Sequence, residues 1–185
     1  MIDEIHNEAK TGMDKAVAHA ADEFAAIRTG RANPSLFANV TVEYYGAPTP
    51  LNQLASFQNP EARTLLITPY DRSALGEIEK ALHNSDVGAN PANDGNVIRV
   101  VMPELTEERR RDYVKIVHSK AEDGRISVRS IRRTAKEAIE KLVKDGEIGE
   151  DEGKRAEKEL DALTKKASEQ IDTAAKNKEA ELLKV

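Results

Sequence analysis

The stretch that decides the fold runs from Glu104 to Asp145 and reads ELTEERRRDYVKIVHSKAEDGRISVRSIRRTAKEAIEKLVKD. Apolar or small residues recur in it at alternating steps of three and four, the heptad spacing of a helix that packs along its length against other helices. These positions are Val114, Val117, Ala121, Gly124, Val128, Ile131, Ala135, Ala138 and Leu142. The spacing predicts one helix of about forty residues, roughly 60 Å long at 1.5 Å per residue. Such a helix is too long for a compact globule, so the rest of the chain has to be arranged around it.

A second stripe on this helix is basic. Between Arg109 and Lys136 ten basic residues stand against three acidic ones, a local charge of +7 in a chain whose formal net charge is −5. The stripe comprises Arg111, Lys115, His118, Arg125, Arg129, Arg132 and Lys136, with Arg133 beside it. No acid occurs from Arg125 to Lys136, whereas ordinary solvated helix faces interleave glutamate with lysine. Because guanidinium groups bind phosphate bidentately, the stripe predicts a face for RNA or another polyanion, recognised by shape more than by sequence. The alternative is a charged face that only meets solvent.

Two more helices are expected beside the long one. The first carries Met13, Val17, Ala20, Phe24 and Ile27 on one face and ends near Gly30, a residue typical of helix C-termini. The segment 145–149 breaks the helical pattern, and a third helix follows to about Leu183. Its apolar positions are Ala156, Leu160, Leu163, Ala167, Ile171 and Ala174. Three helices with such stripes predict a long antiparallel three-helix bundle.

The segment between the first two helices has a different composition. All seven prolines and five of the seven aromatic residues lie between Pro34 and Pro103. Strands are predicted at 40–45, 64–68 and 97–102, with a helix that begins near Asp71 or Ser73 and ends near Leu82. The glycine- and proline-rich stretches 46–50 and 90–95 are expected to be turns, either simple connections or contact tips.

The predicted fold is therefore α+β, a bundle of residues 1–30 and 104–185 with an inserted β/α/β domain of residues 31–103. The two connections should lie side by side and act as a hinge between domains. The hinge residues are Thr29, Gly30 and Arg31 in one connection and Pro103 and Glu104 in the other.

Catalytic and metal-binding patterns were not found. The chain has no cysteine, no phosphate-binding glycine loop, and four histidines without metalloprotease spacing. We expect no catalytic residues, no metal site and no cofactor. The N-terminus lacks the features of a signal peptide, and no apolar run has membrane-spanning length, so a cytoplasmic protein is expected.

Four separated motifs resemble the bacterial ribosome recycling factor family. They are Ile27-Arg28-Thr29-Gly30-Arg31-Ala32-Asn33-Pro34, Tyr44-Tyr45-Gly46-Ala47-Pro48-Thr49-Pro50-Leu51, Leu105-Thr106-Glu107-Glu108-Arg109-Arg110 and Val128-Arg129-Ser130-Ile131-Arg132-Arg133. The motifs occur in the family's order and span the whole chain. Ser130 stands where the family commonly has asparagine.

The resemblance implies an L-shaped monomer with tRNA-like dimensions that binds the ribosome after termination. With elongation factor G and GTP, which the partner hydrolyses, such proteins separate the subunits and release mRNA and tRNA. By motif match, Arg129 and Arg132 would make the main contacts with large-subunit ribosomal RNA, supported by Arg28, Arg31 and Arg133. The basic stripe adds Arg125 and Lys136 to this set. Two other interpretations stay open on the residues alone: a coiled-coil adaptor that binds another protein through its helical stripe, and a small hydrolase that uses carboxylates of the inserted domain.

Overall fold

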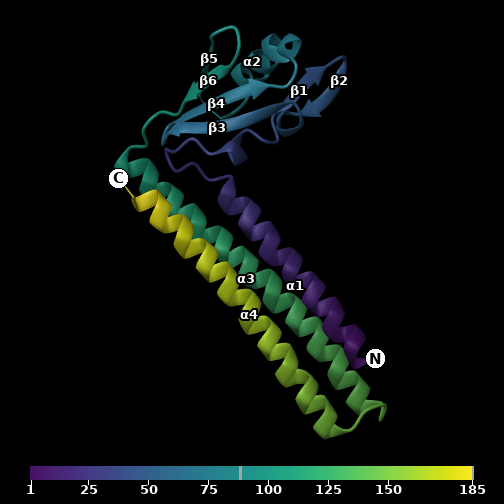
Figure 1. The fold of residues 1–185 in the computed structure, drawn as a ribbon. Helices are drawn as coiled ribbons and strands as arrows, with labels where there is room; N and C mark the ends of the chain where they lie inside the picture. The colour runs from purple at the N-terminus through teal and green to yellow at the C-terminus, as the bar shows by residue number, and fades with distance from the viewer. Residues whose placement is uncertain (88, 185) are drawn as a thin grey trace. The chain divides into compact units, whose positions relative to one another are not determined.

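The computed structural model describes residues 1–87 and 89–184 (Figure 1). Gly88, in the predicted inserted domain, and Val185, at the end of the predicted bundle, lie outside the described residues. The chain divides into two compact units, a helical unit of Met1–Ile27 and Arg111–Val185 and a second unit of Arg28–Arg110. The fold is α+β, which confirms the predicted class. The predicted hinge residues fall near the two ends of the second unit, and their motion stays a prediction.

The helical unit consists of α1 (Ile2–Ala25), α3 (Glu107–Lys144) and α4 (Glu150–Leu183). Figure 1 shows the three helices side by side, with α3 running opposite to α1 and α4. Their apolar stripes meet in a core, as the heptad spacing predicted. The core is formed by Ala9, Met13, Ala20, Phe24, Val117, Ala121, Val128, Ala135, Ile139, Ala156, Leu160, Ala167, Ile171, Ala175 and Leu182. No helix in the described part of the chain is both long and apolar enough to cross a membrane.

The predicted start of the long helix is wrong by three residues. It begins at Glu107 and not at Glu104, because the Thr106 hydroxyl accepts a hydrogen bond from the backbone N–H of Arg109 at 3.2 Å. A threonine in this arrangement satisfies a backbone donor that the first helical turn leaves open.

The predicted end of the first helix is also wrong. α1 ends at Ala25, well before Gly30, although Gly30 does adopt the left-handed conformation with φ +79°. Beyond the helix the backbone joins the second unit instead. The N–H of Ala32 donates to the carbonyl of Ala62 at 2.8 Å, and the Asn59 amide donates to the carbonyl of Ala32.

Glycines permit close approach of the helices. A Cβ added at Gly124 of α3 would lie 3.1 Å from Ile171 Cδ1 on α4 and 3.4 Å from Ala20 Cβ on α1. A Cβ at Gly153 of α4 would lie only 2.6 Å from Val143 Cγ2 on α3. Small residues at these crossings therefore set the distance between helices, at some cost in intrinsic helix propensity.

A lysine occupies one position of the α4 stripe. The buried positions near the end of α4 are Ala175, Lys178 and Leu182, so the predicted Ala174 is displaced by one residue. The Lys178 side chain is only 7% exposed, and its ammonium lies 3.7 Å from a Glu181 carboxylate oxygen. Burial lowers the pKa of Lys178, and the nearby carboxylate only partly opposes this effect.

The second unit contains two antiparallel sheets. The hairpin of β1 (Thr41–Tyr44) and β2 (Ala47–Pro50) is separate from a four-stranded sheet in the order β3-β4-β6-β5. The bounds are Ala55–Glu61 for β3, Thr64–Pro69 for β4, Asn90–Asn93 for β5 and Ile98–Val101 for β6. Helix α2 (Leu75–His83) packs beside both β1 and β5. The core includes Phe37, Val42, Leu51, Leu65, Ile67, Ile78, Leu82, Ile98 and Val100.

The sequence prediction recovered half of these strands. The segments 40–45, 64–68 and 97–102 correspond to β1, β4 and β6, and Asp71 accepts a hydrogen bond from the Ser73 N–H at 2.9 Å just before the helix. The expected turns are present at Gly46 and at Asp94-Gly95, but the rest of these stretches, 47–50 and 90–93, forms β2 and β5, and β3 was not predicted. All three missed strands carry proline and lie at sheet edges, where a strand needs hydrogen bonds on one side only.

We expect Gly153→Ala to destabilise the helical unit by about 1 kcal/mol. Overpacking against the stiff Val143 side chain costs about 1–3 kcal/mol, which exceeds the gain of about 1 kcal/mol in helix propensity. Gly12→Ala is the matched control, since the atom nearest to its added Cβ is the flexible tip of Ile131, Cδ1, at 3.2 Å, and the next two contacts, at 3.5 and 3.6 Å, are ordinary. Chemical denaturation should show the control to be neutral or stabilising. Equal effects of the two substitutions would contradict the packing argument.

We expect Lys178→Met to raise the melting temperature at neutral pH, by about 2–4 °C for each 1 kcal/mol gained. The Lys178 ammonium binds its proton less firmly in the folded protein than in the unfolded chain. The cost to folding stability of burying the charged ammonium is therefore complete at pH values below the lowered pKa. This cost decreases as pH rises through that pKa, because the side chain becomes neutral. The increase in melting temperature from Lys178→Met should therefore be smaller in alkaline buffer. Thermal melts of Lys176→Met, at an exposed neighbouring position, give the control.

Candidate functional site

The predicted basic residues of α3 form one surface, which we call the basic ridge: Arg125, Arg129, Arg132, Arg133 and Lys136. Steps of four, three and four place most of them on one side of the helix, next to the buried stripe. Their side chains are 29% exposed for Arg125, 57% for Arg129 and 81% for Arg133. The ridge therefore reaches solvent, as the sequence predicted.

The expectation of a surface without acids is wrong, because each ridge residue has a carboxylate partner. Glu122 holds both Arg125 and Arg129, at 3.0 and 2.6 Å. Asp172 and Asp161 of α4 accept from Arg125 at 2.6 Å and from Arg132 at 2.8 Å. Glu137 lies 3.0 Å from Arg133, and Glu140 lies 3.6 Å from Lys136. The stretch from Arg125 to Lys136 itself contains no acid. The carboxylate partners come from α4 and from the neighbouring turns of α3.

Some of these pairs also join α3 to α4. His118, Arg125 and Arg132 are seven residues apart on α3 and reach Glu179, Asp172 and Asp161 of α4, the first at 3.1 Å. This is the position at which charged pairs flank the seam between two packed helices. Acids of α4 at steps of 11 and 7 residues, which recur on one face of a helix, were the signal in the sequence that could have found them.

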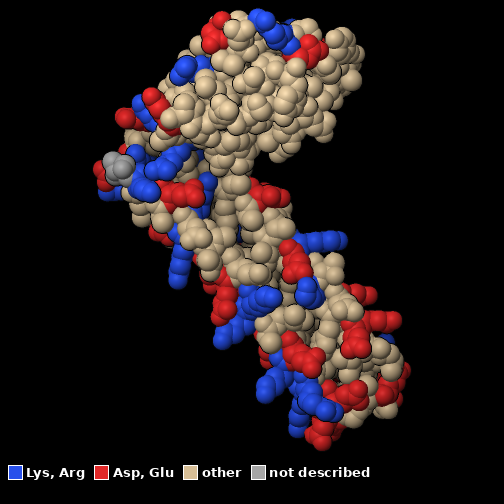
Figure 2. Space-filling model, viewed as in Figure 1, with Lys and Arg blue, Asp and Glu red and all other residues tan. Residues whose placement is uncertain are grey.

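The pairs remain accessible to water. Figure 2 shows Lys and Arg interleaved with Asp and Glu along the visible face of the helical unit. The partner carboxylates of Asp172 and Asp161 are 47% and 57% exposed. Ion pairs of this kind are weak and are screened by salt, so a ligand phosphate can replace the carboxylate.

The electrostatics keep the ridge charged. Hydrogen bonds from Arg129, and next from Arg125, hold the pKa of Glu122 below its ordinary value. Partial burial of Arg125 disfavours its charge, but hydrogen bonds with Asp172 and Glu122 outweigh this effect and leave its pKa raised. The guanidinium groups are therefore positively charged and already oriented.

The other two predicted contact residues belong to the second unit. Arg28 is half-buried and its guanidinium donates to the backbone carbonyl of Asp86. Arg31 is exposed, and its backbone N–H lies 3.4 Å from the Thr29 hydroxyl. The hydrogen bond between Arg28 and the segment after α2 was not expected from the sequence.

The predicted hinge residues form two chain segments in contact. Thr29 is 9% exposed, and a Cβ added at Gly30 would lie 3.5 Å from the Leu105 side chain. Glu104 pairs with Arg63 at 3.4 Å. Gly30 thus combines a left-handed backbone with a close neighbour, a conformation that few other residues adopt. Whether the segments act as a hinge stays a prediction.

Residues 1–87 and 89–184 contain no group of three or more His, Asp or Glu that could hold a metal ion. The chemistry that the ridge itself supports is electrostatic binding of an anionic surface.

Comparison with known proteins points to one family. A family profile described as "Ribosome recycling factor" matches residues 20–183. The chain is 72% identical over 183 residues to a ribosome-recycling factor of Kocuria rhizophila, covering 99% of each chain. It is 71% identical to one of Renibacterium salmoninarum over the full length of both.

Solved structures agree with these relatives. A solution structure of the ribosome recycling factor matches with TM-score 0.83 and 42% identity, over 100% of this chain and 98% of that one. A second match, with TM-score 0.73 and 43% identity over the whole of both chains, comes from models of the T. thermophilus ribosome recycling factor and E. coli elongation factor G bound to the E. coli post-termination complex.

We expect an NMR titration of the Glu122 carboxyl group to have its midpoint below the ordinary glutamate value. The midpoint should move upward in Arg129→Gln, since the hydrogen bond from Arg129 is the largest cause of the lowering. As pH falls through this depressed pKa, the stabilisation from the Glu122 contacts is lost. An unchanged midpoint in Arg129→Gln would mean that the contact is absent in solution.

Proposed function

The chain belongs to the ribosome recycling factor family, and from that premise we propose that it binds the ribosome after termination and, with elongation factor G and GTP, splits the subunits and releases mRNA and tRNA. Similarity over the full chain to a recycling factor described together with elongation factor G on a post-termination complex supports this proposal. The structural observation that carries it is the basic ridge, a row of half-exposed cations along one side of α3.

In this proposal the ridge binds large-subunit ribosomal RNA through backbone phosphates. Arg129 and Arg132 make the main contacts, and Arg125, Arg133 and Lys136 extend the row. Binding exchanges the exposed carboxylate partners for phosphate oxygens, which also accept bidentate hydrogen bonds. The guanidinium groups are already held in place, so little side-chain entropy is lost on binding. Arg28 and Arg31 would provide contacts from the second unit.

The second unit is proposed to move about Thr29, Gly30 and Arg31 and about Pro103 and Glu104 when elongation factor G acts on it. Short connections that contain a residue with positive φ are suited to absorb such a change. The protein itself would carry out no bond chemistry and need no cofactor, because GTP is used by the partner. We propose that the protein acts in the cytoplasm, where ribosomes are recycled.

The alternative of a coiled-coil adaptor is less well supported. An adaptor would offer its apolar stripe to a partner, but Val117, Val128 and Ile139 of α3 are fully buried within their own helical unit. The hydrolase alternative has no support from the comparisons, which match recycling factors over the whole chain.

We expect Arg132→Ala to weaken binding to isolated large subunits by about 1–3 kcal/mol, the order for a charge-assisted contact with nucleic acid. Cosedimentation at several salt concentrations measures this, and removal of several ridge arginines should flatten the salt dependence. Lys166→Ala is the matched control, because it removes one exposed cation that lines a cavity between α1 and α4. Circular dichroism should show both variants folded. Unchanged binding by folded Arg132→Ala would exclude the assignment.

We expect the opposite effect from Asp161→Asn. This substitution frees Arg132 from its carboxylate partner and removes a negative charge from the binding face. Binding to large subunits should become tighter in the same assay. If the ridge served only to join α3 and α4, the affinity for large subunits would not increase. Subunit splitting in the presence of elongation factor G and GTP then tests whether tighter binding affects turnover.

A further inference from the structure

The hairpin β1–β2 has one free edge. Its register pairs Tyr44 with Ala47 and Val42 with Thr49 around a two-residue turn. In such a hairpin these pairs exchange the hydrogen bonds, so the N–H and C=O groups of Thr41 and Glu43 point away from β2. Among the described residues these outward groups have no hydrogen-bond partner.

The opposite edge of the hairpin is closed. Pro48 and Pro50 lie opposite Glu43 and Thr41 in β2, where a backbone N–H would otherwise point outward. Proline at these positions removes the donors that would pair with another strand, a common protection of sheet edges. Proline therefore protects the β2 edge, whereas the β1 edge carries no proline and lies beside α2.

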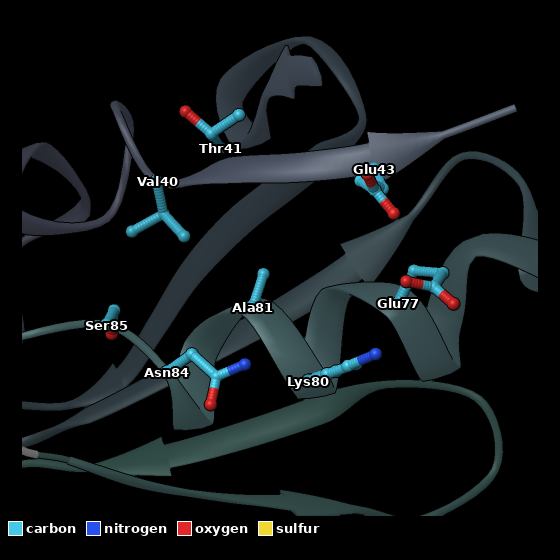
Figure 3. A pocket seen from close by; sticks show the side chains of 8 residues that line it. All are labelled: Val40, Thr41, Glu43, Glu77, Lys80, Ala81, Asn84 and Ser85. Carbon is cyan, nitrogen blue, oxygen red and sulfur yellow. The ribbon is translucent and has the colours of Figure 1, made fainter. Parts of the chain in front are cut away.

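The free edge of β1 opens into a cavity of about 430 Å³ whose other wall is α2 (Figure 3). This volume lies within the range of ordinary ligand sites. The lining residues are Val40, Thr41 and Glu43 on the β1 side and Glu77, Lys80, Ala81, Asn84 and Ser85 on the α2 side. We call this cavity the β1–α2 groove.

The charges of the groove favour a basic ligand. Figure 3 shows Glu43 and Glu77 at one end of the groove, and no ion pair joins either carboxylate to a cation in the described part of the chain. Lys80 is the single cation of the lining. Two carboxylates at one end disfavour the phosphates of nucleic acid and favour lysine or arginine.

An exposed aromatic residue stands at the end of the same strand. Tyr45 is 82% exposed and, with φ 49°, is the non-glycine residue of positive φ among the described residues. Asparagine is the ordinary choice at this turn position before glycine. The Tyr45 ring instead packs edge-on against the Tyr44 ring, with the two ring centroids 4.6 Å apart. Both tyrosine hydroxyls donate hydrogen bonds to the Asp71 carboxylate. A strained residue that holds an aromatic ring in solvent points to a binding role.

We propose that the β1–α2 groove binds an extended, basic segment of a partner protein, which pairs with β1 as a third strand. Backbone hydrogen bonds to Thr41 and Glu43 would supply affinity, as in other strand-addition complexes. Glu43 and Glu77 select a basic side chain, and the exposed ring of Tyr45 offers a face for a second cation. The groove lies in the second unit, and this binding does not depend on the basic ridge.

The test uses the full chain labelled with nitrogen-15 and a short synthetic peptide of alternating lysine and valine. Binding should shift the backbone amides of Thr41 and Glu43 in NMR spectra and slow their hydrogen exchange. A peptide of alternating glutamate and valine, and a short oligouridylate, should leave these amides unchanged. Preferential binding of the oligouridylate at Tyr45 would assign the surface to RNA and overturn the proposal.

Three variants separate binding from folding. Glu43→Pro removes an outward N–H together with the carboxylate while leaving the β2 ladder intact, and Glu43→Gln keeps the N–H but removes the carboxylate, so the difference between the two reports the backbone hydrogen bond. Each should weaken peptide binding about three- to tenfold, the order of one lost hydrogen bond or exposed contact. Tyr45→Asn should weaken binding while the melting temperature stays equal or rises, because asparagine suits the turn.

Glu61→Gln, an exposed carboxylate on β3, is the matched control and should bind the peptide normally. Arg132→Ala should also bind it normally, which separates this proposal from ribosome binding by the ridge. Full affinity in Tyr45→Asn together with full affinity in Glu43→Pro, or no protection of the Thr41 and Glu43 amides by the basic peptide, would overturn the proposal.

Discussion

Close contact of α3 with α1 and α4 is the constraint on which the helical unit depends. Gly124 lies between Ile171 of one neighbour and Ala20 of the other, and larger side chains at such crossings would force the helices apart. The same closeness brings Asp172 within 2.6 Å of Arg125. Packing of small apolar residues in the interior therefore decides which charges meet at the surface.

This coupling changes how the basic ridge is understood. The row of cations is not an open positive surface but a set of arginines held by exposed carboxylates on two helices. Weak, water-accessible pairs orient the guanidinium groups and can be exchanged for other anions, as the proposed binding of ribosomal RNA requires. Stronger, buried pairs would stabilise the helices but would be costly to break. The accessibility of the pairs, more than their number, keeps the ridge available to a ligand.

The second unit has a different surface chemistry. Its hairpin presents a strand edge without proline, carboxylates and an exposed tyrosine, whereas the ridge presents arginine. An anionic RNA surface and a basic protein segment are thus suited to different parts of the same chain.

The amino-acid sequence alone determined the three helices, their apolar stripes and the position of the basic row, because helical periodicity is a local property that repeats along the chain. It also identified the family, through motifs such as Val128-Arg129-Ser130-Ile131-Arg132-Arg133. Only the tertiary structure decided that Asp161 and Asp172 face the ridge, that Lys178 is buried, and that proline-containing segments form edge strands. These features depend on which residues of distant segments come into contact, and no local pattern encodes the distance between two helices or the partner of a strand edge.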